Sequence, residues 1–150
     1  MENAVIKKIT VTENIALLTL MPPQKMPHLA YTVINRLAES KIRLLMMSAP
    51  HLGGGITLAA DEKSIHSILK ITAEVKNVFT TVQSENSKIS LLGENLDDTA
   101  FIVKNILDPL SEYNADVRLI SSSPHEISIL MPSCKTAPFL YEITKSADDF

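Results

Sequence analysis

The chain has 150 residues, 45% hydrophobic and 21% charged, which is normal for a folded globular protein and enough for one ordinary domain or two very small ones. Its formal net charge is −3 and its lysines and arginines form no cluster, which argues against nucleic-acid and membrane-surface partners, because both need a basic stripe. The sequence contains no apolar run of roughly 20 residues, no apolar segment typical of a signal peptide and a single cysteine, Cys134, so we expect a cytoplasmic protein.

The first half of the chain predicts an alternation of strands and helices. Runs of β-branched or continuously apolar residues predict strands at residues 5–12, 15–20, 42–47, 56–60 and 78–82. Apolar residues at helical spacing predict helices over residues 27–39 and 61–75. Thr12–Asn14 is expected to turn the chain between the first two strands. Gly53–Gly55 is expected to form a flexible hairpin loop, because it lacks the Lys-Ser/Thr of a phosphate-binding loop and precedes a strand.

The second half repeats this pattern. Strands are predicted at residues 88–92, 115–120 and 126–131, and helices over residues 102–110 and from residue 136, before a loose tail from Lys145 to Phe150. The order strand–helix–strand–strand–helix–strand therefore occurs twice, about 70 residues apart. Short local similarities support a duplication, since Ser48–His51 is similar to Ser122–His125 and Val11–Asn14 to Gln83–Asn86.

The repeat leaves one strand over at the N-terminus. Residues 5–11 have no place in the first repeat, while the second repeat lacks a strand after its last helix. The economical solution is that the N-terminal strand completes the sheet of the second unit. We therefore expect one unit at residues 13–83, inserted into a second unit formed by residues 4–12 and 84–146.

Two segments resemble the regulatory region of aspartate kinase, with its tandem ACT domains. Ala115–Met131 is similar to the family segment in which a strand with a polar pair ends in a serine/threonine cluster and is followed by a short strand containing Ile-Ser. Ala38–Met46 is similar to the family's helix end and second strand, usually AEAGINVDM. The spare N-terminal strand is also a feature of this family, and the resemblance covers essentially the whole chain.

The resemblance implies a fold and a function. The fold is of the α+β class, with two ferredoxin-like βαββαβ ACT units, antiparallel sheets with helices on one face, and the N-terminal strand completing the second unit. The function is binding of an amino-acid effector, typically of the lysine or threonine class, at interfaces where ACT units pair into a homodimer. No kinase catalytic region is present, so the chain is expected to be a regulatory fragment, a separate regulatory subunit acting with a kinase catalytic domain or subunit, or a stand-alone ACT regulator.

The first candidate effector site is the start of the helix after Pro27. Free backbone N–H groups at a helix start suit a carboxylate. Five residues are expected to form a binding site there: Gln24, Lys25, His28, Leu29 and Ala30. The family usually has an aspartate and then Pro-Gly here, so Lys25 and His28 are departures from its pattern. The alternative is an ordinary solvated loop and helix start.

The second candidate effector site comprises Asp116, Val117, Arg118 and Ser121. Asp116 and Arg118 alternate with apolar residues along the predicted strand 115–120, where Asp116 is able to accept hydrogen bonds from an effector ammonium. The Ser121 hydroxyl adds a further polar contact. The alternative is the solvent face of an edge strand followed by a serine-rich turn.

The sequence contains no recognisable catalytic, cofactor or metal motif. Its four histidines and Cys134 lack the spacing of a zinc site, and no nucleophile stands near a base in a known pattern. The favoured hypothesis is a non-catalytic regulatory module without a cofactor that binds an amino acid. The alternatives are an ACT dimerisation module that has lost its ligand and a small enzyme on a ferredoxin-like sheet.

Overall fold

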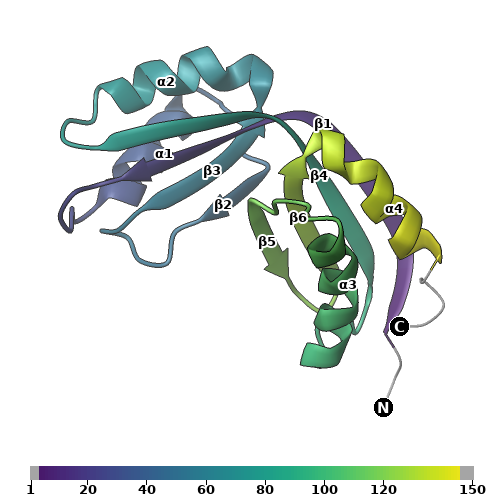
Figure 1. Cartoon of the computed structure of the whole chain (residues 1–150). Coiled ribbons are helices and arrows are strands. Elements are labelled where there is room, and N and C mark those ends of the chain that lie inside the picture. The colour runs from purple at the N-terminus through teal and green to yellow at the C-terminus, as the bar shows by residue number, and fades with distance from the viewer. Residues whose placement is uncertain (1–3, 146–150) are drawn as a thin grey trace. The chain divides into compact units, whose positions relative to one another are not determined.

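The computed structural model describes residues 4–145, which form an α+β structure of four α-helices, two short 3-10 helices and six strands with antiparallel pairing (Figure 1). The chain divides into two compact units. We call residues 14–84 the inserted unit, and the residues on either side, up to 13 and from 85 on, the flanking unit. Of the predicted tail, only Lys145 lies within the described residues, as the last residue of a helix.

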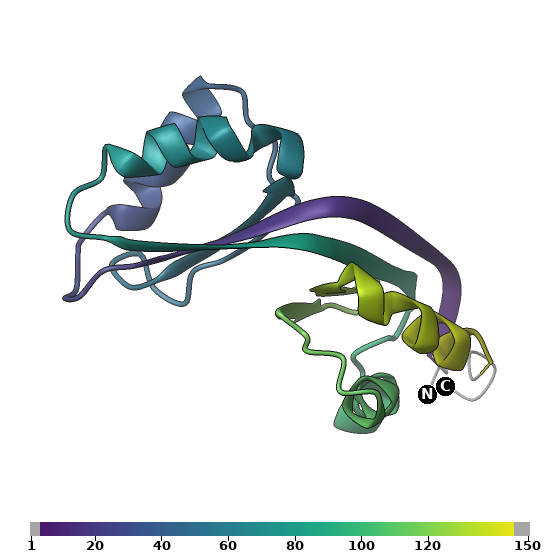
Figure 2. The same ribbon diagram turned by 45° about the horizontal axis from the view of Figure 1, so that its top comes forward.

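The inserted unit has the strand order β2-β3-β1-β4. Its elements are the later part of β1 (Val5–Met21), α1 (Leu29–Glu39), β2 (Met46–Ser48), β3 (Ile56–Asp61), η1 (Glu62–Ser64), α2 (Ile65–Ala73) and the first part of β4 (Phe79–Glu94). Strand β1 pairs with β3 in a register that runs from Ile15 opposite Asp61 to Leu20 opposite Ile56. The helices α1 and α2 lie over the same face of these strands (Figure 2). Alternating residues of β1, such as Leu18 and Leu20, face the helices and are fully buried with Val33.

The flanking unit has the strand order β1-β4-β6-β5. It uses the first part of β1 and the later part of β4, followed by α3 (Ala100–Glu112), β5 (Leu119–Ser122), β6 (Glu126–Pro132), η2 (Ser133–Lys135) and α4 (Thr136–Lys145). Its core gathers buried side chains from β4, β6, α3 and α4, with Phe139 as a fully buried aromatic residue. Ile6 and Ile9 of β1 pack against this core.

A glycine allows β1 and β4 to approach closely in the flanking unit. A Cβ atom added to Gly93 would lie 1.9 Å from the carbonyl oxygen of Val5, which is far inside any van der Waals contact. Only glycine fits where one backbone comes this near to another.

The prediction of a chain-reversing turn at Thr12–Asn14 was wrong. Residues 5–21 form one continuous strand, and the separately predicted strands 78–82 and 88–92 are likewise one strand, β4. Each long strand has one residue with positive φ at the boundary between the units, Asn14 with φ 58° in β1 and Glu85 with φ 59° in β4. Asparagine favours this conformation in turns and in isolated strand irregularities alike, so the sequence did not distinguish the two.

The strands predicted at 42–47 and 115–120 begin later than expected. Strand β2 starts at Met46 and β5 at Leu119, because the preceding residues are held by the end of the helix. The N–H of Ile42 donates to Leu37 O at 3.0 Å, and the N–H of Ala115 donates to Leu110 O at 3.0 Å. Both follow a residue with positive φ, as is common at helix C-termini. Bonding to the neighbouring strand begins only at Leu45 and Arg118, whose N–H groups donate to Ala59 O and to Leu130 O, each at 2.8 Å.

Within residues 4–145, no helix is long and apolar enough to cross a membrane.

Candidate functional site

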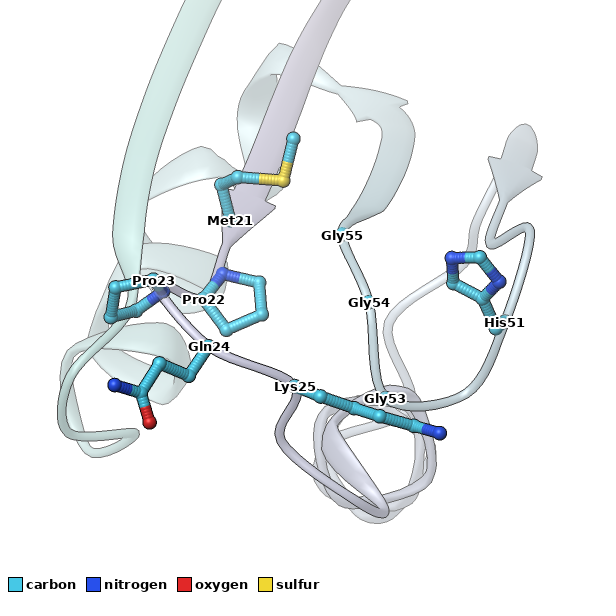
Figure 3. Close-up of a pocket in the computed structure, with 9 residues that line it drawn as sticks. All are labelled: Met21, Pro22, Pro23, Gln24, Lys25, His51, Gly53, Gly54 and Gly55. Carbon is cyan, nitrogen blue, oxygen red and sulfur yellow. The ribbon is translucent and has the colours of Figure 1, made fainter.

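Two loops of the inserted unit enclose a pocket of about 510 Å³ (Figure 3). One loop connects β1 to α1 and the other connects β2 to β3. The pocket is lined by Met21, Pro22, Pro23, Gln24, Lys25, His51, Gly53, Gly54 and Gly55. Its volume falls within the range of about 300–1,000 Å³ that is usual for small-molecule sites.

Lys25 is the cationic side chain of this pocket, and the imidazole of His51 adds a second hydrogen-bonding group. Both side chains are exposed, and neither has a hydrogen-bond or ion-pair partner among the described residues. In Figure 3 the Lys25 side chain runs past Gly53, while the amide of Gln24 points away from the glycine segment. A second pocket of about 440 Å³ shares Pro23, Gln24 and Lys25. The lining of neither pocket includes an aspartate or a glutamate.

The expectation that the first amides of α1 are free was wrong for Leu29 and Ala30. The N–H of Leu29 donates to Met26 O at 3.2 Å, and the N–H of Ala30 donates to Leu52 O at 3.2 Å. The side chains of both residues are buried in the core of the inserted unit. The loop between β2 and β3 thus occupies part of the helix start, because its backbone supplies an acceptor.

His28 stands immediately before α1 with φ 67° and makes no hydrogen bond from its side chain to the helix. Its carbonyl oxygen accepts from the N–H of Thr32 at 2.8 Å. Of the five residues predicted for the first site, the structure therefore brings Gln24 and Lys25 into the pocket lining, keeps His28 exposed beside α1, and buries Leu29 and Ala30.

The four residues predicted for the second site lie in the flanking unit. The prediction that Asp116 and Arg118 lie on a strand was wrong, because β5 begins at Leu119 and Asp116 has φ 54°. Asp116 and Val117 help to line a pocket of about 330 Å³ beside the end of α3. The Nη2 atom of Arg118 lies 3.5 Å from Oδ2 of Asp116. The Nε atom of Arg118 is buried and has no hydrogen-bond partner among the described residues. Ser121 lies on β5 opposite Ser128 and does not line this pocket.

Seven of the lining residues were not predicted from the sequence: Met21, Pro22, Pro23, His51 and Gly53–Gly55. The run of three glycines was visible, but it was interpreted as a flexible hairpin. The spatial proximity of this loop to residues 21–25 depends on the pairing of β3 with β1, which has no local sequence pattern. Among the described residues, no group of three or more His, Cys, Asp or Glu side chains is placed to hold a metal ion.

No protein-family model and no curated protein matches the chain by sequence. Several solved structures share its fold. The regulatory subunit of aspartate kinase from Thermus thermophilus, in a ligand-free form, matches with a TM-score of 0.81 and 17% identity over 94% of this chain and 97% of that chain. The Thermus flavus regulatory subunit matches with a TM-score of 0.80 and 17% identity over 95% of this chain and 98% of that one.

The same fold occurs within a longer enzyme. Escherichia coli aspartokinase III, in complex with lysine and aspartate, matches with a TM-score of 0.70 and 18% identity over 97% of this chain and 34% of that chain. The resemblance found in the sequence is thus confirmed at the level of fold. The chain has the fold of the regulatory region of aspartate kinase, which in the longer enzyme is only one part of the polypeptide.

Proposed function

We propose that the chain is a regulatory module without catalytic machinery, which binds a small metabolite in the cytoplasm and controls an associated aspartate kinase catalytic domain or subunit. The likeness to two separate regulatory subunits, which extends over nearly the whole of each chain, carries this proposal. It is built as two ACT units, at residues 13–83 and at 4–12 plus 84–146. The packing of Ile6 and Ile9 against the flanking core supports the assignment of the N-terminal strand to the second unit.

The effector that we propose is an amino acid. Lysine and aspartate are present in the E. coli aspartokinase III structure of the same fold, which supports this class of ligand. Gln24, Lys25 and His28 are proposed to contact it in the inserted unit, with Leu29 and Ala30 as the wall behind. In the flanking unit the proposed contacts are Asp116, Val117, Arg118 and Ser121.

Regulation requires that the effector favours one arrangement of the module over another. The exposed edge strands β2 and β5 are suited to pair ACT units of two chains into a homodimer. An effector held between paired units gains contacts in only one arrangement, and its binding free energy shifts the population toward that arrangement. A linked kinase domain would then respond to the change.

A ligand-free dimerisation module is the second candidate. The occupied amides of Leu29 and Ala30 favour it, because an effector carboxylate cannot use donors that already have partners. On this alternative the chain forms a dimer, and no amino acid changes its stability.

Calorimetry and thermal unfolding with each of the twenty amino acids test the proposal. A ligand at 100 times its dissociation constant stabilises the folded state by about 2.7 kcal/mol, which gives a clear rise in melting temperature. We expect at least one amino acid to bind and to raise the melting temperature. Sedimentation of the same samples reports the oligomeric state. A stable dimer that responds to none of the twenty would contradict amino-acid binding and support the second candidate.

A further inference from the structure

We propose that the pocket formed by Met21–Lys25 and His51–Gly55 takes a small organic acid: an anionic head on an apolar body, with no ammonium group. This inference rests on the proposed function, since it names the ligand class of the same regulatory module. It differs from the amino-acid class in one testable respect, which is the absence of the ligand's ammonium group.

The charges of the pocket select an anion. Lys25 and His51 provide donors for a carboxylate, and within residues 4–145 no hydrogen bond or ion pair occupies either side chain. A ligand ammonium would meet no carboxylate in the linings of the two adjoining pockets and would be repelled by Lys25. Met21, Pro22 and Pro23 supply the apolar wall against which a hydrocarbon body packs.

The three glycines position the wall of this pocket. A Cβ at Gly53 would lie 3.2 Å from Cγ of Lys25, a Cβ at Gly54 would lie 2.6 Å from Cδ2 of His51, and a Cβ at Gly55 would lie 2.5 Å from Sδ of Met21. Each glycine therefore leaves room for one side chain that lines the pocket (Figure 3). None of the three has a positive φ, so close packing and not an unusual backbone conformation explains the glycines.

The flanking unit provides an internal comparison. His125 follows Pro124 as His51 follows Pro50, but there the strands β5 and β6 are joined only by residues 123–125. The N–H of Ser123 donates to Glu126 O at 2.8 Å, so the turn is tight.

That short turn is also bonded to the end of β4 and to the loop before α3. The N–H of Gly93 donates to His125 O at 2.9 Å, and the N–H of Leu96 donates to Pro124 O at 3.0 Å. In the inserted unit the chain continues from His51 through Leu52 and the glycines before β3 begins, and this extension forms one side of the pocket. The extension is thus a specialised feature of one repeat.

Four probes test the charge preference in calorimetric titrations of the full chain. Three share one branched carbon skeleton: 4-methyl-2-oxopentanoate is an anion, leucine a zwitterion and leucinamide a cation. Inorganic phosphate is an anion without an apolar body. We expect the oxo acid to bind most tightly, phosphate and leucine more weakly, and leucinamide not at all.

Two charge reversals localise the binding. Lys25→Glu should weaken the binding of the oxo acid by about tenfold or more, because it removes the charge-assisted hydrogen bond from Lys25 to the ligand carboxylate. Lys70→Glu, at an exposed position of α2 outside the pocket lining, should leave the affinity unchanged. Because Lys25 is also exposed, both variants should unfold at the temperature of the parent.

The outcomes separate this inference from the proposed function. Equal or tighter binding of leucine or leucinamide, equal effects of the two reversals, or no binding of the oxo acid would overturn the inference. If the oxo acid does not bind while one of the twenty amino acids does, the proposed function stands and the inference of an organic-acid ligand is wrong. If the oxo acid binds as expected and no amino acid does, the inference stands and the amino-acid effector is wrong.

Discussion

At the scale of single residues, glycines illustrate how the same substitution has different consequences. Gly93 faces the backbone of Val5, which cannot move without separating β1 from β4. Gly54 faces the imidazole of His51, an exposed side chain that is able to rotate away. What lies opposite the missing Cβ therefore decides the cost of adding it.

Gly93→Ala should lower the free energy of unfolding by about 1–3 kcal/mol, because the added methyl group forces two backbones apart. Gly54→Ala adds the same group and should cost less than about 1 kcal/mol. Urea denaturation of both variants measures the difference. Equal effects would show that β1 and β4 do not approach each other closely at Gly93.

The pair of Lys7 and Glu94 links the first part of β1 to β4 in the flanking unit. Their Nζ and Oε1 atoms are 2.7 Å apart. The hydrogen bond from Lys7, reinforced by its charge and by that of His125, holds the pKa of Glu94 below its ordinary value. A carboxyl with a lowered pKa in the folded state stabilises the fold above its unfolded pKa, and this contribution disappears as the pH falls through its folded pKa.

Lys7→Ala should raise the pKa of Glu94 toward its ordinary value, as measured by an NMR titration of its side chain. The stability difference between the variant and the parent should be present at neutral pH and disappear in acid. Lys104→Ala, which breaks the pair with Asp108 inside α3, is the control and should leave the Glu94 titration unchanged. An unaltered Glu94 pKa in Lys7→Ala would exclude the contact.

At the scale of elements, the helices and the buried strands follow closely from the sequence. Helical spacing placed α1, α2 and α3, because their apolar stripes pack on a sheet and so repeat with the helical period. Strands β3 and β6 were also close to their predicted ranges. Strands β2 and β5 were not, since hydrogen bonds at the helix ends hold the residues before them, and such a helix-terminating bond leaves no periodic pattern in the sequence.

The starts of α1 and α3 differ in how they are capped. The Thr99 hydroxyl accepts from the N–H of Ile102 at 3.4 Å. The side chain of His28 makes no such bond, and at the start of α1 the loop between β2 and β3 supplies a backbone acceptor for Ala30 instead. Thr99→Ala should therefore cost about 1 kcal/mol, and Thr99→Ser should cost much less, because it keeps the acceptor. Thermal unfolding of the two variants measures this, and equal melting temperatures would exclude a capping role for Thr99.

At the scale of the whole molecule, the duplication was visible in the order of elements, and the fold comparisons confirm the family likeness at the level of fold. The candidate site was only partly predictable. Gln24 and Lys25 were selected because they precede a helix, which is a local pattern. His51 and the glycines were missed because strand pairing brings them to the same place, and strand pairing is not a local property.

Assignment of the N-terminal strand to the flanking unit leads to a prediction about hydrogen exchange. Ile9→Ser should destabilise the flanking unit by about 1–2 kcal/mol and speed amide exchange at Leu91 and Ile129, since Ile9 is partly buried against that core. Lys8→Ser, at the exposed neighbouring position, is the control. Faster exchange confined to the inserted unit, for example at Leu58, would contradict the assignment.

The central claim is that a small ligand binds in the inserted unit of a regulatory module. The most direct test is an NMR titration of the isotopically labelled chain with the ligand that raises its melting temperature most. We expect amide shifts to move at residues 24–26, 28 and 51–55 and to saturate with the calorimetric affinity. Shifts that concentrate elsewhere, or a spectrum that no ligand of either class changes, would contradict it.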